Sequence, residues 1–158
     1  MQPRIEYRKF AQEPLKHMLA LEKYVAESGL DPKLVHLLKM RASQINGCAY
    51  CLDMHSIDAR ALGESEQRLY TLEAWSETPF FTDRERAALA WTESLTLIAQ
   101  THAPDDVYAD LQKHFAEKEI VDLTFVVGTI NLWNRLAISM RAVPGHYKPA
   151  KSTAAASS

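Results

Sequence analysis

The sequence has little glycine, proline or cysteine and no long hydrophobic run. Its 158 residues include 5 Gly, 7 Pro and 2 Cys. Because glycine and proline interrupt helices, their scarcity favours an all-α fold. No apolar stretch approaches the ~18 residues of a membrane span. The 18 Lys+Arg and 20 Asp+Glu leave a formal net charge of −2. We therefore expect no membrane and no nucleic-acid partner.

The two cysteines, Cys48 and Cys51, have no evident structural role. A domain of this length buries roughly two-thirds of the surface that its unfolded chain exposes, so it needs no disulfide or metal to hold a core. The N-terminus shows no apolar stretch of signal-peptide type, which predicts a cytoplasmic protein. In a reducing cytosol, a lone Cys-x-x-Cys is more typical of redox or metal chemistry than of a structural disulfide.

Hydrophobic spacing predicts one all-α domain of about seven helices over residues 1–147, followed by a low-complexity tail over residues 148–158. The expected helices cover about 13–28, 31–46, 48–62, 65–75, some twenty residues from 82, 104–115 and 117–143. The last of them is apolar nearly all round between Leu123 and Leu132, so we expect it in the core or in a subunit interface.

Several helix boundaries carry a specific signal. Asp31 before Pro32 is typical of a helix start, and Thr82 with Glu85 forms a predicted capping box. Inside the last helix, Asn131 and Asn134 stand among apolar residues. A buried amide needs partners, so we expect these two side chains to form hydrogen bonds between helices.

The chemistry-bearing segment runs from Cys48 to His55. A thiolate at a helix N-terminus is stabilised by the helix dipole and the free N–H groups, which favours Cys48 as the nucleophile. Cys51 and His55 lie one turn apart on the same face, so His55 can accept the Cys51 proton, which favours Cys51. The spacing alone leaves both alternatives open. Either thiol can attack a peroxide while the other closes a disulfide.

Two other interpretations compete for these residues. Free cysteines are among the most buried residue types, so the pair could simply pack in the core. Alternatively, Cys48, Cys51 and His55 could bind zinc with His36 as the fourth ligand, but no second Cys-x-x-Cys is present to complete a structural site. We expect neither a metal nor a cofactor.

The segment 39–55, with its Asn-Gly-Cys-Ala-Tyr-Cys core and terminal His55, resembles the central motif of the AhpD-like alkyl hydroperoxidases in the carboxymuconolactone decarboxylase superfamily. The segments 85–93 and 131–136 are similar to later blocks of the same group. The resemblance covers roughly residues 10 to 147. A Cys-x-x-Cys alone is a weak signal, whereas this pair followed by x-x-x-His on an all-α background is specific.

The resemblance implies a helical protomer, assembled into homotrimers or homohexamers, that reduces a hydroperoxide substrate by a thiol–disulfide cycle. It implies that Cys51 is the peroxidatic cysteine, Cys48 the resolving cysteine and His55 part of a proton relay. The disulfide would be reduced by a thiol or dithiol reductant or an adaptor protein. An antioxidant function is thereby expected.

The sequence departs from the family pattern at two positions. His36 stands where the family has a proton-accepting Glu, and Tyr50, which we expect in a pocket wall, stands where the family has a His. The departures predict either weaker peroxidase activity or a shorter relay through His55 and His36. By residue type alone, Glu93 is a candidate replacement for the missing carboxylate.

Two further functions fit the same sequence. A carboxymuconolactone decarboxylase-like enzyme would act on a lactone acid, but members of that arm generally lack the Cys-x-x-Cys. A non-catalytic helical oligomer could instead sense redox state or bind a partner through a disulfide that changes its packing.

Overall fold

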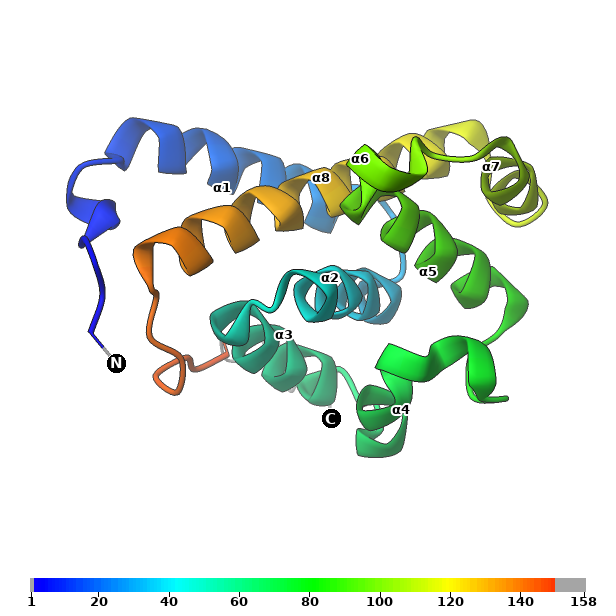
Figure 1. The fold of residues 1–158 in the computed structure, drawn as a ribbon, viewed down its shortest axis with the longest axis horizontal. Helices are drawn as coiled ribbons and strands as arrows, with labels where there is room; N and C mark the ends of the chain where they lie inside the picture. The colour runs from blue at the N-terminus through cyan, green and yellow to red at the C-terminus, as the bar shows by residue number, and fades with distance from the viewer. Residues whose placement is uncertain (1, 150–158) are drawn as a thin grey trace, which may run out of the picture.

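The computed structural model describes residues 2–149, and all regular structure within that range is helical (Figure 1). The predicted all-α fold is confirmed, with eight α-helices and two short 3-10 helices over the described residues. They are η1 (Tyr7–Lys9), α1 (Gln12–Glu27), α2 (Pro32–Asn46), α3 (Ala49–Ala61), α4 (Glu66–Thr71), η2 (Leu72–Glu77), α5 (Asp83–Thr96), α6 (Ile98–Thr101), α7 (Asp105–Gln112) and α8 (Glu117–Met140). Of the predicted tail, residues 150–158 lie outside the described range.

Helix α2 is the centre of the bundle and packs against α3, α5 and α8. Figure 1 shows α1 lying along α8 on one side of this centre. The predicted cap of α2 is present, because the Asp31 carboxylate accepts a hydrogen bond from the Lys33 N–H at 2.9 Å, directly after Pro32 takes the first helical position. This cap fixes where the central helix begins.

The long fifth helix that the spacing predicted is divided in two. Its start is as predicted, with Thr82 and Glu85 forming a capping box. The helix ends at Thr96, however, and four residues of α6 follow. Leu97 leaves helical geometry (φ −100°, ψ 30°), and the Thr101 hydroxyl then donates to the Ser94 carbonyl at 2.6 Å. A side chain thus satisfies a carbonyl that a continuous helix would have bonded through its backbone.

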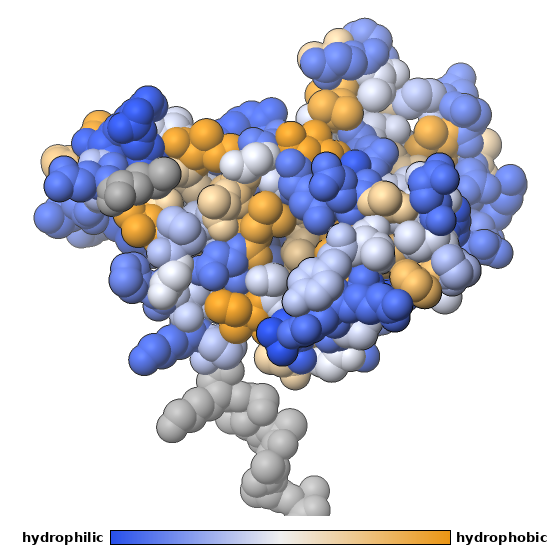
Figure 2. Space-filling model, turned by 60° about the horizontal axis from the view of Figure 1, so that its bottom comes forward, coloured by the Kyte–Doolittle hydropathy of each residue, from blue (hydrophilic) through white to orange (hydrophobic). Residues whose placement is uncertain are grey.

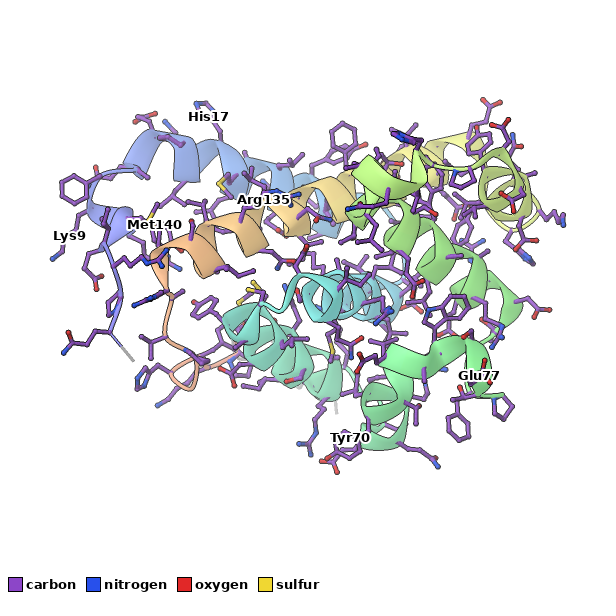
Figure 3. The ribbon with its side chains drawn as sticks, in the orientation of Figure 1. Lys9, His17, Tyr70, Glu77, Arg135 and Met140 are labelled. Atoms are coloured by element: carbon purple, nitrogen blue, oxygen red, sulfur yellow. The ribbon has the colours of Figure 1, made fainter. Side chains whose placement is uncertain are left out.

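Helix α8 ends at Met140, three residues earlier than predicted, because Arg141 adopts a left-handed conformation (φ 55°). The Met140 carbonyl accepts a hydrogen bond from the Arg4 N–H at 3.0 Å, which ties the N-terminal segment to the end of α8. Figure 3 labels Met140 at this end of the helix. The 3-10 helix η1 contacts α1, and its Tyr7 lines a hollow together with Tyr50 of α3 and Met140 of α8.

The two asparagines of α8 join helices, as predicted. Asn131 donates to Thr96 Oγ1 of α5 at 3.1 Å. The Asn46 amide of α2 donates to the side-chain oxygens of Asn131 and Asn134, at 3.0 and 2.8 Å. The C-terminal half of α8 is therefore held to its neighbours by hydrogen bonds as well as by packing.

Buried apolar residues form two clusters. The main core lies between α2, α5, α7 and α8 and includes Leu37, Leu38, Leu89 and Leu123. The smaller one, here called the cysteine cluster, consists of Ala42, Cys48, Cys51, Ile130 and Ala137. On the face drawn in Figure 2, hydrophobic surface appears as separate patches among hydrophilic ones. Within residues 2–149, no helix combines the length and the apolar composition needed to cross a membrane.

Candidate functional site

Cys48 forms the head of α3. Gly47 ends α2 in a left-handed conformation (φ 70°), and the Cys48 N–H then donates to the Ser43 carbonyl at 2.9 Å. Cys48 itself is the N-cap of α3, because its Sγ accepts a hydrogen bond from the Cys51 N–H at 3.4 Å. The predicted position of a thiol at a helix N-terminus is therefore confirmed, and the helix dipole favours negative charge on this sulfur.

A buried amide on α8 lies beside both sulfurs. Asn134 is fully buried and donates to the Ser43 hydroxyl at 3.0 Å. Hydrogen bonds from this amide reach both Cys48 and Cys51. The cysteine cluster thus has apolar walls and two buried polar side chains, Asn134 and Ser43, that can stabilise a thiolate.

Of the two thiol protons, only the one on Cys48 is readily lost. Hydrogen bonding to the Cys51 side chain, together with the Cys51 N–H, lowers the pKa of Cys48 to about 7 against the opposing effect of burial. The same contact with Cys48, with burial added, raises the pKa of Cys51 far above its usual range. Both side chains are reduced and 1% exposed. As the pH rises through about 7 the pair therefore acquires a single negative charge, centred on the capping sulfur.

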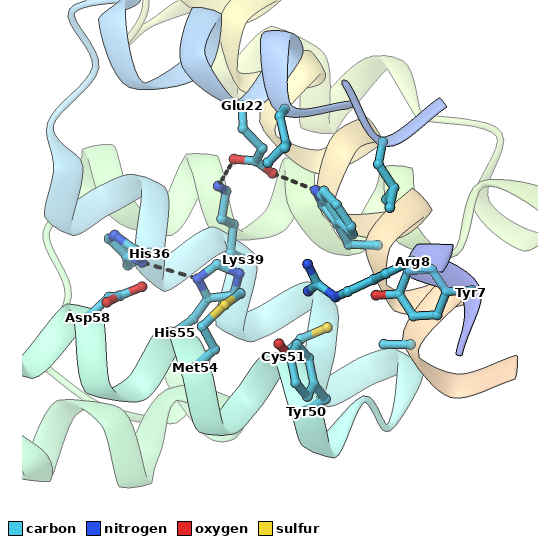
Figure 4. A pocket seen from close by; sticks show the side chains of 14 residues that line it. Tyr7, Arg8, Glu22, His36, Lys39, Tyr50, Cys51, Met54, His55 and Asp58 are labelled. Atoms are coloured by element: carbon cyan, nitrogen blue, oxygen red, sulfur yellow. Dashed lines mark hydrogen bonds and ion pairs between the residues drawn. The ribbon is translucent and has the colours of Figure 1, made fainter. Parts of the chain in front are cut away.

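A cavity of about 370 Å³ opens beside Cys51 (Figure 4). Its wall includes Cys51 but not Cys48, which borders a separate and smaller hollow. Tyr50 lines the cavity, as the sequence predicted. The other lining residues are Tyr7, Arg8, Leu15, Leu19, Glu22, His36, Lys39, Met54, His55, Asp58, Trp133 and Ala137. Of the two sulfurs, a molecule in this cavity would therefore contact that of Cys51.

His55 and His36 meet at the cavity wall. Their Nδ1 atoms are 3.3 Å apart, so one ring donates to the other in a way set by the tautomers. Burial, followed by the positive charge of Lys39, lowers the pKa of both rings, and that of His55 falls well below its usual range. Both imidazoles are therefore neutral at pH 7. Within residues 2–149 no hydrogen bond joins His55 to Cys51, so the predicted direct contact is replaced by the contact with His36.

The cavity has two carboxylates that sequence reasoning missed, Glu22 of α1 and Asp58 of α3. Glu22 accepts a hydrogen bond from Lys39 Nζ at 2.5 Å and one from Trp133 Nε1 at 2.9 Å. The expectation that Glu93 enters the site is wrong. Its carboxylate binds Arg41 at 2.7 Å and Trp75 at 2.6 Å, and it does not line the cavity. Glu22 lies 26 residues before Cys48 on another helix, and no motif connects the two.

One group of side chains has the residue types of a metal site. Among the described residues, the ligand atoms of His36, His55 and Asp58 lie within 4.8 Å of one another, and neither cysteine joins them. Asp58 also accepts a hydrogen bond from the Tyr147 hydroxyl at 2.8 Å. The Lys39 charge that lowers the pKa of both histidines equally disfavours a bound cation. The geometry thus fits a proton-handling pair better than a metal centre.

Sequence comparison assigns the family. The sequence model of the carboxymuconolactone decarboxylase family matches residues 12–94, which include α2, both cysteines and both histidines of the site. The chain belongs to this family. It is also 44% identical to the uncharacterized protein YdfG of Bacillus subtilis over 140 residues, which are 89% of this chain and 95% of YdfG.

Structure comparison places the chain among the AhpD-like members of the family. A protein of unknown function from Agrobacterium tumefaciens, proposed to be the antioxidant defence protein AhpD, shares 45% identity with a TM-score of 0.89. The match covers 92% of this chain and all of that one. The debrominase Bmp8 shares the fold at 18% identity, with a TM-score of 0.74 over 82% of this chain and 70% of its own. The predicted AhpD-like assignment is therefore confirmed.

Proposed function

We propose that this family member is a thiol-dependent peroxidase that reduces hydroperoxides by forming a Cys51–Cys48 disulfide. The observation that carries the proposal is the placement of two reduced cysteines across the first turn of α3, with Cys51 alone facing a cavity large enough for an organic substrate. A disulfide needs both sulfurs close together, and the Cys48 cap brings its sulfur against the first turn that carries Cys51.

The two cysteines have different parts in the proposed reaction. Cys48 has the lower pKa, whereas Cys51 faces the cavity. We assign attack to Cys51, because a thiolate must reach its substrate. The proton on the Cys51 thiol passes to the Cys48 thiolate, with which it already shares a hydrogen bond. The neutral His55 and His36 line the same cavity as Cys51 without a direct hydrogen bond to it, so they can relay a proton that a molecule in the cavity delivers to them.

The reaction balances with a hydroperoxide as the oxidant. The Cys51 thiolate attacks the terminal peroxide oxygen, so that an S–O bond forms, the O–O bond breaks, and the leaving alkoxide takes a proton to become an alcohol. Cys48, deprotonated again, attacks the sulfenic sulfur of Cys51. The S–S bond forms and hydroxide leaves as water. A thiol or dithiol reductant, or an adaptor protein, then supplies two electrons and two protons to restore both thiols.

The proposal includes two further expectations, one about the cellular compartment and one about the oligomeric state. A thiol cycle of this kind requires reducing partners, so we place it in the cytoplasm. We also propose that the protomer forms a homotrimer or homohexamer, because α8 leaves Val121, Phe125 and Leu132 exposed along one face. Light scattering on the purified protein measures the mass of the assembly, and a monomer would contradict the second expectation.

The test is hydroperoxide consumption with a dithiol reductant by wild type, Cys51→Ser and Cys48→Ser. We expect loss of turnover in both variants, but a trappable sulfenic acid on Cys51 only in Cys48→Ser. Exposed Ser139→Ala on α8 is a control outside the cavity. No consumption by wild type contradicts the peroxidase and leaves a decarboxylase-like enzyme or a redox sensor. Sulfenate formed only on Cys48 reverses the assignment of the two thiols.

A further inference from the structure

The cavity beside Cys51 is much larger than hydrogen peroxide requires. One water molecule occupies about 30 Å³ of liquid, whereas the cavity measures about 370 Å³. That volume falls in the range of small-molecule sites. Its walls include Leu15, Leu19, Met54 and Trp133, which offer apolar surface to a carbon skeleton. The space therefore fits an organic molecule with an apolar body.

Two of the charged groups in this cavity neutralise each other. Lys39 and Glu22 form a short ion pair, and their side chains are 7% and 24% exposed. The second Glu22 oxygen is taken by Trp133. Asp58, on the side of His36, accepts the Tyr147 hydroxyl. Lys39 and Glu22 therefore need no ligand to balance their charges, whereas the Asp58 carboxylate keeps its negative charge and disfavours an anion on its side of the cavity.

Arg8 differs from Lys39, the other positively charged side chain of the cavity. Its guanidinium lies over the Tyr7 ring, 5.8 Å from the ring centre, and lines the cavity (Figure 4). Within residues 2–149, no carboxylate lies within ion-pair distance of Arg8. Guanidinium groups bind carboxylates in a forked geometry that lysine cannot reproduce. An arginine that is part of a cavity wall and has no protein carboxylate is suited to an anionic ligand.

We propose that the cavity binds organic hydroperoxides that carry a carboxylate, with the carboxylate on Arg8, the carbon chain against the apolar wall and the hydroperoxide at Cys51. This inference rests on the proposed peroxidase function and adds the substrate class to it. The chemical step is unchanged: Cys51 takes the terminal oxygen, and the product is a hydroxy acid. Arg8 is a specificity-determining residue that holds the far end of the substrate.

The kinetic test compares 8-hydroperoxyoctanoic acid with its methyl ester, which have the same reacting group and differ in charge. We expect wild type to favour the acid by about tenfold or more in kcat/KM, because a charge-assisted hydrogen bond contributes roughly 1.5–3 kcal/mol. Arg8→Gln should remove that preference by slowing the acid alone, and Arg8→Lys should retain part of it. Lys9→Gln, an exposed charge in the same 3-10 helix but outside this cavity, is the matched control.

A binding test separates failure of this inference from failure of the peroxidase. Calorimetry on the reduced protein measures binding of the product, 8-hydroxyoctanoate, and of its methyl ester. If neither hydroperoxide is consumed but the hydroxy acid binds and Arg8→Gln abolishes binding, the anion site stands and the peroxidase fails. If both hydroperoxides are consumed equally well and Arg8→Gln changes neither rate, the substrate class is wrong and the peroxidase stands. Equal loss for acid and ester in Arg8→Gln also overturns it, because that pattern indicates a structural role.

Discussion

The main core and the cysteine cluster share two helices, α2 and α8, but are held together differently. Helix α2 gives Leu37 and Leu38 to the main core, while its later residue Ala42 belongs to the cysteine cluster. Helix α8 divides in the same way between Leu123 and Ala137. The main core is apolar, whereas the cysteine cluster has a buried hydrogen-bond network beside it. The N-terminal parts of α2 and α8 thus contribute to the main core, and their C-terminal parts contribute to the cluster that contains the reactive cysteines.

The largest effect on stability is expected from Leu38→Ala in the main core. Leu38 is fully buried, so truncation should lower the free energy of unfolding by about 2–5 kcal/mol. Urea denaturation measures this change. Because Leu38 is outside the cysteine cluster, the pKa of Cys48 should stay near 7 in the folded variant. A shift in that pKa would show that the two regions are not independent.

Asn134→Ala should affect both the free energy of unfolding and the pKa of Cys48. It leaves the Ser43 hydroxyl and the Asn46 amide without one partner each, which we expect to cost about 1–3 kcal/mol. It also removes a hydrogen bond that stabilises the thiolate, so the pKa of Cys48 should rise. Urea denaturation and thiolate absorbance measure the two changes. Thr92→Val, which removes a buried hydroxyl from α5, is the control and should leave the thiol pKa unchanged.

The paired histidines should make stability depend on pH in the acid range. Burial and Lys39 lower the pKa of His36 and His55 in the folded state, so below the unfolded value of about 6.5 the unfolded chain binds protons that the folded chain does not. The free energy of unfolding should therefore fall as pH drops below about 6.5. The slope, measured by urea denaturation at several pH values, should be shallower in His55→Gln. The same slope in both proteins would contradict the burial argument.

The smallest expected effect is confined to the titration of Cys48 itself. Thiolate absorbance of the reduced protein should rise with pH around 7, and alkylation of the pair should accelerate over the same range. In Cys48→Ala this transition should disappear, and the pKa of Cys51 should fall because its interaction with Cys48 is gone. If Cys48→Ala still titrates near 7 and Cys51→Ala does not, the single charge is centred on Cys51 instead.

Local signals made most of the fold predictable. Asp31, Gly47 and the capping box of Thr82 act within one turn of the chain, so their effects can be read from neighbouring residues. The break after Thr96 could not be read in this way. Ile98 continues the apolar spacing of α5, yet it is half exposed, and the Thr101 hydroxyl that ends the helix acts across seven residues.

The candidate site was predictable only where its residues share α3. Cys48, Cys51 and His55 follow from spacing, because one helix turn fixes which side chains are neighbours. His36 entered as a departure from the family pattern, and the structure brings it to His55. Glu22, Arg8 and Trp133 come from three other segments and meet only when the chain is folded. Glu93 has the residue type of a relay group, but Arg41 and Trp75 hold it elsewhere.

The sulfur that caps α3 is also one of the two sulfurs that the proposed cycle oxidises. In the reduced protein, the Cys51 N–H donates to Cys48 Sγ. A sulfur that has entered a disulfide no longer carries the thiolate charge and is a weaker acceptor, so the first turn of α3 should loosen when the disulfide forms. Amide hydrogen exchange at Cys51 would then follow the oxidation state of the protein. A reductant that must reach a buried disulfide would meet it at the moment when the surrounding backbone opens most easily.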